Sequence, residues 1–249
     1  MGQCRGAGCS LSICSLTARK SSAGLREGIR PQSGLLPRKS ALYATLPAVS
    51  LIELILRQPL AYRLWMAPWA AQKLEPVLRN NDVGSIKRVL DVGCGPGTNA
   101  RAFTHTDYVG VDLNAAYIAD ARKRYGRNFV AADVRGNDFP VGSGFDCILL
   151  NSLLHHLDRD STRSLLRRLT ELLTPDGHVN IIELVIPDEW GFPRALAKAD
   201  RGAYPRSLVE WKSLFSEAFD PVAFEPFPVT GGSVKLWEMV YFKGRLKKN

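Results

Sequence analysis

The segment between residues 89 and 99 constrains the fold more than any other, because a short apolar run there gives way to closely spaced glycines. Residues 89–92 are Val-Leu-Asp-Val, a composition typical of a buried strand, and Gly93, Gly95 and Gly97 follow at every second position. Glycine permits sharp turns and lets a ligand approach bare backbone. Parallel α/β sheets bind nucleotide-like molecules where a strand runs into such a loop. The segment therefore predicts an α/β sheet with a ligand site at this strand end.

Two more acidic residues end apolar runs farther along the chain. Asp112 follows residues 108–111 and lies 21 residues after Asp91, and Asp133 follows residues 129–132 after another 21 residues. The ends of successive parallel strands line up on one edge of a sheet, so we expect three carboxylates along that edge. An acid at this distance from a glycine loop can accept hydrogen bonds from both hydroxyls of a ribose. The next acid could accept one from an adenine amino group.

The charge at this edge indicates what kind of ligand fits. Three acids near the glycine loop would repel a pyrophosphate, and the third glycine comes one residue earlier than in the dinucleotide-binding pattern G-x-G-x-x-G. Asp91, on the strand itself, suits a ligand that carries positive charge. A sulfonium with an amino-acid tail therefore fits better than a phosphate, although an NAD enzyme of similar architecture stays an alternative.

At these residues the chain resembles the class I S-adenosylmethionine-dependent methyltransferases, whose first motif matches the strand and loop at 89–97. Residues 145–151 look like the fourth strand of that family, which ends beside the methyl group, and residues 172–179 look like the helix end, turn and fifth strand that follow. The resemblance covers roughly residues 86–186 and continues to 242. It implies a three-layer Rossmann-like α/β fold, with a mostly parallel seven-stranded sheet, helices on both faces and an antiparallel last strand.

The resemblance also implies where S-adenosylmethionine would bind. Asp91 and the glycines would hold its methionine part, Asp112 its ribose, and Asp133 with Val134 its adenine, while Asn151 would flank the transferring methyl group. The predicted cofactor-binding residues are Asp91, Gly93, Cys94, Gly95, Gly97, Asp112, Leu113, Asp133, Val134 and Asn151. The pattern looks most like the small-molecule branch of the family, which includes enzymes of quinone and secondary-metabolite biosynthesis.

Methyl transfer from a sulfonium is an in-line displacement, so the protein mainly aligns donor and acceptor, which can contribute about 7–11 kcal/mol. A general base is needed only when the acceptor is protonated. His155 and His156 are the natural candidates, since imidazole has a pKa of about 6.5. Neighbouring side chains point in different directions, so we expect at most one of them to face the substrate; the alternative is that both are structural. Asp146 lies inside its strand rather than at its end, and we predict no metal.

The loop predicted over residues 185–206 combines aromatic and basic side chains beside the same sheet edge. This combination suits an apolar or aromatic acceptor with an acidic group, although an ordinary solvated loop is the alternative. Residues 151–154, Asn-Ser-Leu-Leu, lack the prolines and aromatic residue of methyltransferases that act on nucleic-acid base amines, and the paired glutamates of arginine-directed enzymes are also absent. The aromatic and basic residues of the loop over 185–206 are Trp190, Phe192, Arg194, Lys198, Arg201, Tyr204 and Arg206.

The net charge of +9 is concentrated at the two ends of the chain. Residues 1–40 carry seven basic residues and one acid, and residues 243–249 carry four basic residues and no acid. The stretch between them, with 22 basic and 23 acidic residues, is almost neutral, which argues against a nucleic-acid groove. We predict a disordered basic leader over 1–40, with an organelle transit peptide as an alternative. A helical cap over 41–85 and a methyltransferase domain over 86–249 would follow.

Two other functions stay open at this point. The chain could be a non-catalytic S-adenosylmethionine-binding partner subunit, or a nucleic-acid or protein methyltransferase that uses its basic ends as an arm. The five cysteines form no disulfide or zinc pattern, and no apolar run is long enough to span a membrane, so we expect a cytoplasmic protein. No feature of the sequence predicts an oligomeric state.

Hydrophobic periodicity and turn residues predict the remaining elements. They are helices over 115–125, 161–173 and 207–219, a turn at 174–177, strands over 222–224 and 236–242, and two or three helices within 47–80, broken near Pro59 and Pro68.

Overall fold

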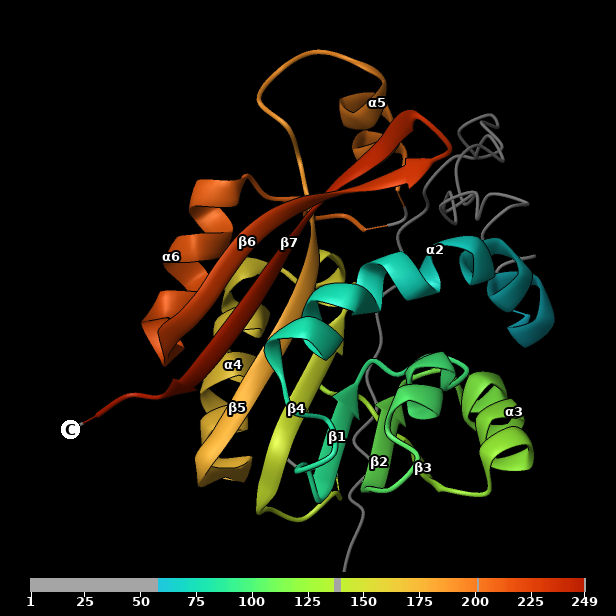
Figure 1. Ribbon diagram of the computed structural model, residues 1–249, viewed down its shortest axis with the longest axis vertical. Coiled ribbons are helices and arrows are strands. Elements are labelled where there is room, and N and C mark those ends of the chain that lie inside the picture. Colours follow the sequence, from blue (N-terminus) through green and yellow to red (C-terminus); the bar gives the residue numbers. More distant parts are fainter. Residues whose placement is uncertain (1–57, 137–139, 201, 249) are drawn as a thin grey trace, which may run out of the picture. The chain divides into compact units, whose positions relative to one another are not determined.

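The computed structural model describes residues 58–136, 140–200 and 202–248. In this part of the chain seven strands form one sheet in the order β3-β2-β1-β4-β5-β7-β6 (Figure 1). Strands β1 to β5 pair in parallel, and β7 is antiparallel to both of its neighbours. The predicted seven-stranded, mostly parallel sheet is therefore confirmed. The strands are β1 (Arg88–Val92), β2 (Asp107–Asp112), β3 (Asn128–Ala131), β4 (Phe145–Asn151), β5 (Leu173–Val185), β6 (Phe219–Gly231) and β7 (Val234–Leu246).

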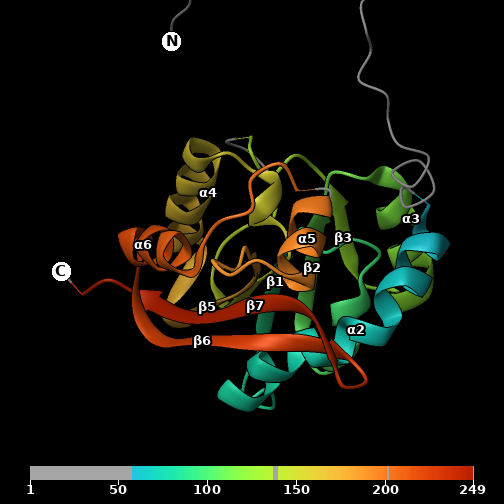
Figure 2. The same ribbon diagram turned by 90° about the horizontal axis from the view of Figure 1, so that it is seen from above.

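Helices cover both faces of the sheet, as Figure 2 shows from above. One buried cluster joins the sheet to α4 and α6, and a second joins it to α2, α3 and α5. The leucine stripe of α4 packs into the first cluster through Leu165, Leu166 and Leu169. The predicted three layers are thus confirmed. The helices are α2 (Pro59–Asn80), η1 (Thr98–Ala102), α3 (Ala115–Tyr125), η2 (Leu154–His156), α4 (Arg159–Leu172), α5 (Phe192–Ala199) and α6 (Leu208–Ala218).

Helices α3 and α6 begin at side-chain caps that the sequence encodes. The Asn114 side chain accepts hydrogen bonds from the first free amides of α3, as N-cap residues do, and the helix has the predicted bounds. Ser207 and Glu210 form both bonds of a capping box at the start of α6. Local sequence therefore sets where these two helices start.

Several predicted elements differ in the structure. The strands predicted over 222–224 and 236–242 are longer, as β6 and β7. The described part of residues 47–80 holds one helix rather than two or three; Pro59 begins it, and Pro68 lies inside it. Burial of Leu74 and Val77 against the sheet stabilises this helix beyond the effect of its local sequence. The interval 185–206 was expected to be a loop but contains α5, with a proline in its first turn, where proline is tolerated.

The predicted turn at 174–177 is also wrong, because these residues belong to β5. Phe145 pairs with Leu173 and Cys147 with His178, so the extra residues are accommodated as an irregularity in the register. The predicted leader over 1–40 and the first part of the cap, residues 41–57, lie outside the described residues. None of the helices that the structure describes has the length and apolar character needed to cross a bilayer.

Candidate functional site

The carboxyl ends of β1, β2 and β4 meet at one edge of the sheet. Val92 of β1 pairs with Val111 of β2 on one side and with Leu150 of β4 on the other. Beyond Val92 the glycine loop turns over β2, and the amides of Gly93 and Cys94 donate to the Val111 carbonyl oxygen at 2.8 and 2.9 Å. The strand ends that were predicted to hold the ligand therefore do lie together.

The glycine loop requires its glycines at two positions. Gly93 and Gly97 have φ angles of +73° and +76°, a region that favours glycine. A Cβ atom at Gly93 would lie 2.8 Å from Leu153 Cδ1, and one at Gly97 would lie 2.8 Å from Phe129 Cζ. The loop consequently has room only for bare backbone beside the strand ends.

Asp112 is held against this loop by two backbone amides. Its Oδ2 accepts from Gly95 N at 2.9 Å, and its Oδ1 accepts from Asn114 N at 2.8 Å. Burial raises the pKa of Asp112, while these two amide hydrogen bonds act in the opposite direction. Each carboxylate oxygen can accept more than one hydrogen bond, so the group can still receive two neighbouring hydroxyls. Leu113, the next residue, is exposed.

Asp91 is fully buried, and one of its two carboxylate oxygens has no partner. Oδ2 accepts from the Tyr108 hydroxyl and from Asn99 Nδ2, the latter at 3.0 Å. Oδ1 has no hydrogen-bond partner among the described residues. Burial raises the pKa of Asp91 to about 6, even though the hydrogen bonds from Tyr108 and Asn99 lower it. A buried carboxylate oxygen without a partner is costly, which favours a site that is completed by a donor from a ligand.

A chain of hydrogen bonds runs from Asp91 across the strand ends to helix α2. Beyond Asn99, the Asn151 amide donates to Asn99 Oδ1 at 3.3 Å. The Ser152 hydroxyl donates to Asn151 Oδ1 at 3.2 Å, and Lys73 Nζ donates to Ser152 Oγ at 3.0 Å. Burial lowers the pKa of Lys73, and the charges of Asp200 and Glu183 raise it. The chain thus has a carboxylate at one end and an amine at the other.

This chain borders a cavity between α2, the glycine loop and the end of β4. The cavity has the Lys73 amine on one side, while Asn99 connects another side to the Asp91 carboxylate, whose Oδ1 has no partner among the described residues. Such a pair of opposite charges matches the carboxylate and ammonium groups of an amino-acid moiety. Burial, followed by the charges of the neighbouring acids, raises the pKa of Cys94, so this thiol is a neutral part of the wall. The lining residues are Ala70, Lys73, Gly93, Cys94, Thr98, Asn99, Asn151 and Ser152.

Three residues of the hydrogen-bond chain beside this cavity, Lys73, Asn99 and Ser152, were not among the sequence candidates. Lys73 lies on α2, and no sequence pattern places this helix next to the end of β4. Only the tertiary structure brings Lys73 to Ser152. Asn99 directly follows the glycine motif, which is a signal that could have identified it. Ser152 is the one non-glycine residue with positive φ, +59°, in the described part of the chain. Such backbone strain clusters at functional sites, but the sequence does not reveal it.

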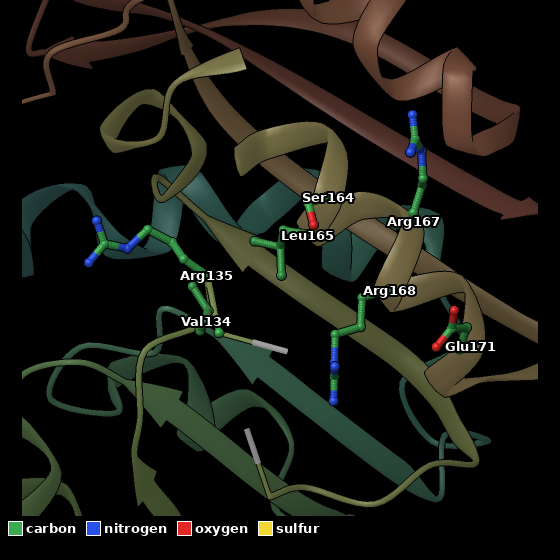
Figure 3. A pocket seen from close by; sticks show the side chains of 8 residues that line it. Val134, Arg135, Ser164, Leu165, Arg167, Arg168 and Glu171 are labelled. Atoms are coloured by element: carbon green, nitrogen blue, oxygen red, sulfur yellow. The ribbon is translucent and has the colours of Figure 1, made fainter. Parts of the chain in front are cut away.

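Asp133 and Val134 lie farther along the same edge. Asp133 forms an ion pair with Arg135 at 2.6 Å, and the hydrogen bonds from Arg135 lower its pKa. The Val134 side chain is buried and packs in the same cluster as Leu165 of α4. Figure 3 shows the neighbouring cavity, which Val134 and Arg135 of this loop line together with Leu165 and Arg168 of α4. This second cavity shares no lining residue with the one at Lys73.

His155 does not fit the predicted role of general base. The side chain is buried, with Nδ1 2.7 Å from Glu183 Oε2 and Nε2 3.1 Å from Asp200 Oδ1. Burial alone would lower the pKa of His155, but the charge of Glu183 and the hydrogen bonds to both acids raise it to about 9. At neutral pH the ring is therefore an imidazolium with both nitrogens engaged, which cannot accept a proton from a substrate.

His156 remains the candidate base of the pair. Its side chain is exposed, and its ring centroid lies 4.3 Å from that of His155. Ligand atoms of His155, His156 and Asp200 lie within 4.8 Å of one another, a set that could in principle hold a metal ion. However, Nε2 of His155 already contacts Asp200 directly, so the observed geometry is that of an ion pair.

The segment predicted to bind an acidic acceptor uses some of its basic residues structurally. Arg206 is buried and donates to the carbonyl oxygens of Leu154 and Leu157 at 3.1 and 2.8 Å. Arg194 and Lys198 lie over the ring of Trp190, which is 84% exposed. The cations beside aromatic rings are thus present, but Arg206 is committed to the backbone, and Arg194 also donates to the carbonyl oxygens of Pro187 and Asp188. Arg201 lies outside the described residues.

The sequence was also compared with known proteins. A family profile described as "Methyltransferase domain" matches residues 89–177. An uncharacterized methyltransferase of Mycobacterium tuberculosis is 36% identical over 104 residues, which are 40% of this chain and 51% of that protein. This chain therefore spans about half the length of that curated relative. The trans-aconitate 2-methyltransferase of Escherichia coli is 28% identical over 193 residues, covering 70% of this chain and 69% of the enzyme.

The fold was compared with solved structures in the same way. The apo form of the S-adenosylmethionine-dependent methyltransferase SibL superimposes with a TM-score of 0.58 at 21% sequence identity. The match covers 75% of this chain and 58% of SibL. At this identity the similarity concerns the fold alone.

Proposed function

We propose that the chain is a class I S-adenosylmethionine-dependent methyltransferase that transfers a methyl group to a small organic acceptor, and the domain profile over residues 89–177 and the two methyltransferase relatives support this. The observation that carries the proposal is the hydrogen-bond chain from Lys73 to Asp91. Its two charged ends complement an amino acid zwitterion. Lys73 would bind the carboxylate of the methionine part, and the unpartnered Asp91 Oδ1 would accept from its ammonium group.

The remaining cofactor contacts would follow the strand ends. The backbone of Gly93, Gly95 and Gly97 would lie beside the methionine part, with Cys94 behind it. Asp112, which two amides hold in place, would accept from the ribose hydroxyls, and the exposed Leu113 would cover the sugar.

Asp133 would accept from the adenine amino group after moving away from Arg135, and the backbone of Val134 would contact the ring. Adenine would thus lie at the far end of the same sheet edge from Lys73.

The chemistry requires alignment more than proton transfer. The bound cofactor supplies a methyl group that its sulfonium already activates. Asn151, whose amide is fixed by Asn99 at 3.3 Å, would flank the line of transfer. His156 would take the proton from an acceptor that is protonated at working pH, because its ring is exposed whereas His155 is enclosed by carboxylates.

The acceptor that we propose carries an acidic group on an apolar or aromatic body, as in quinone-related or secondary metabolites. Arg194 and Lys198 beside Trp190 support this class, and the Escherichia coli relative is named for an organic acid. We also propose a cytoplasmic location, which the free thiols of Cys94 and Cys147 support.

Calorimetry with S-adenosylmethionine and S-adenosylhomocysteine, with NAD in a parallel titration, tests the cofactor. We expect binding of both S-adenosyl compounds and no binding of NAD. Incubation with labelled S-adenosylmethionine, trans-aconitate and a metabolite extract then tests transfer. Absence of affinity for either S-adenosyl compound would refute the proposal, and binding without a labelled product would favour a non-catalytic partner subunit.

A further inference from the structure

Glu183 organises the loop that follows β4. Its side chain is fully buried at the end of β5 and accepts from the amides of Leu153 and Leu154, the former at 2.8 Å. The same carboxylate contacts His155 Nδ1 at 2.7 Å. Leu153 in turn fills the space beside Gly93 where a side chain would stand. The geometry of the glycine loop and that of the β4 loop are therefore connected through Glu183.

The opposite side of His155 contacts the segment that follows α5. Asp200 accepts at His155 Nε2, and Tyr204 N donates to the His155 carbonyl oxygen at 2.9 Å. Gly202 packs so closely that an added Cβ would lie 2.0 Å from His155 Cδ2. Arg206 adds two hydrogen bonds to carbonyl oxygens of the β4 loop. Contacts from four alternate residues, 200, 202, 204 and 206, thus join this segment to the residues around His155.

These contacts lie next to the cavity at the end of β4. Glu183 holds Leu153, which directly follows the lining residue Ser152 and packs against the lining residue Gly93. The segment over 186–206 is therefore fixed next to the place where an acceptor would approach the methyl group.

We propose that His155 is a positioning residue which, between Glu183 and Asp200, clamps the segment 186–206 against the β4 loop to form one wall of the acceptor site. This inference rests on the proposed function. The clamp sets how tightly the acceptor binds, while the methionine and ribose contacts of the cofactor lie on other residues. The clamp transfers no proton to or from the acceptor.

Asp200→Ala tests the clamp without disturbing the buried core, and Asp200→Asn retains a hydrogen-bond acceptor for Nε2. Asp188→Ala is the matched control, since Asp188 lies in the same segment and outside the clamp. Hydrogen exchange of the full chain, monitored at residues 186–206, should accelerate roughly tenfold in Asp200→Ala and remain at the wild-type rate in Asp188→Ala. The exchange rate of Asp200→Asn should lie between the rates of these two variants. The dissociation constant of S-adenosylhomocysteine should stay within about twofold in all three variants.

With an acceptor found in the labelled-product assay, Asp200→Ala should raise KM roughly tenfold and change kcat by less than about threefold. Unchanged hydrogen exchange in Asp200→Ala would overturn the clamp. So would a stoichiometric metal ion in the purified protein, because Nε2 would then be a ligand. If the wild-type protein bound no S-adenosyl compound, the proposed function would fail, whereas the exchange experiment would still report on the clamp.

Discussion

At the scale of single residues, the site depends on carboxylates whose environments differ sharply. Asp91 is buried with one unpartnered oxygen, Asp112 is held by two amides, and Asp133 is paired with Arg135 near the surface. These three acids at the same sheet edge do not share one pKa direction: the pKa is raised for Asp91 and Asp112 and lowered for Asp133. Residue type and spacing predict their shared edge, but their protonation depends on partners that only the fold supplies.

The role of Asp112 leads to a direct prediction. Asp112→Ala should weaken binding of S-adenosylhomocysteine roughly 10- to 100-fold, because ribose hydroxyls would lose a charged acceptor and Gly95 N would lose its partner. Calorimetry measures the change, and Asp176→Ala, an exposed acid at the opposite ends of the strands, is the control. An unaltered dissociation constant in Asp112→Ala would show that the ribose binds elsewhere.

At the scale of elements, the central βα units follow local sequence closely and the segments around them do not. Helix α3 has the bounds that its Asn114 cap and Gly126 end predict. Helix α2 continues through Pro68 because Leu74 and Val77 bury their side chains against the sheet. Helix α5 forms within an interval whose composition suggested a loop. Where packing against a distant element determines whether a helix forms, periodicity and turn residues are insufficient to predict the helix.

The packing of the segment after α5 gives an element-scale prediction. Gly202→Ala should destabilise the protein by about 1–3 kcal/mol, because the added methyl group would overlap the His155 ring. Gly191→Ala, in the same segment, is the matched control, since the nearest atom to its Cβ would be Pro193 Cδ at 3.7 Å. Thermal denaturation followed by circular dichroism measures both variants. Equal melting temperatures would mean that the segment does not pack on His155.

At the scale of the whole molecule, the buried ion pair of His155 links global stability to pH. The pKa of His155 is raised to about 9 in the folded protein, compared with about 6.5 in an unfolded chain. The groups that face its ring are Glu183, Asp200 and the neighbouring His156. The contribution of His155 to the stability of the folded protein is therefore fully present below about pH 6.5. It is lost as the pH rises through about 9, because the folded state then releases the proton that it binds more tightly than the unfolded chain does.

We therefore expect the free energy of unfolding to fall, on the order of 1–3 kcal/mol, between about pH 6.5 and 9.5. Urea denaturation across this range measures it. His155→Gln should have a flatter profile over the same interval, since the other titrating groups are unchanged. A wild-type profile as flat as that of His155→Gln would contradict the assigned protonation.

The apolar runs of the central strands, the glycine loop and the row of acids at one edge were determined by the sequence, because each depends on short-range patterns: apolar composition, the conformational freedom of glycine and the regular spacing of strand ends. Their common resemblance to one family was visible for the same reason. Tertiary structure alone decided that Lys73 completes the hydrogen-bond chain to Asp91 and that His155 is clamped between two acids. These contacts join residues far apart in the chain, and burial and charge at such contacts are set by packing, which no local pattern encodes.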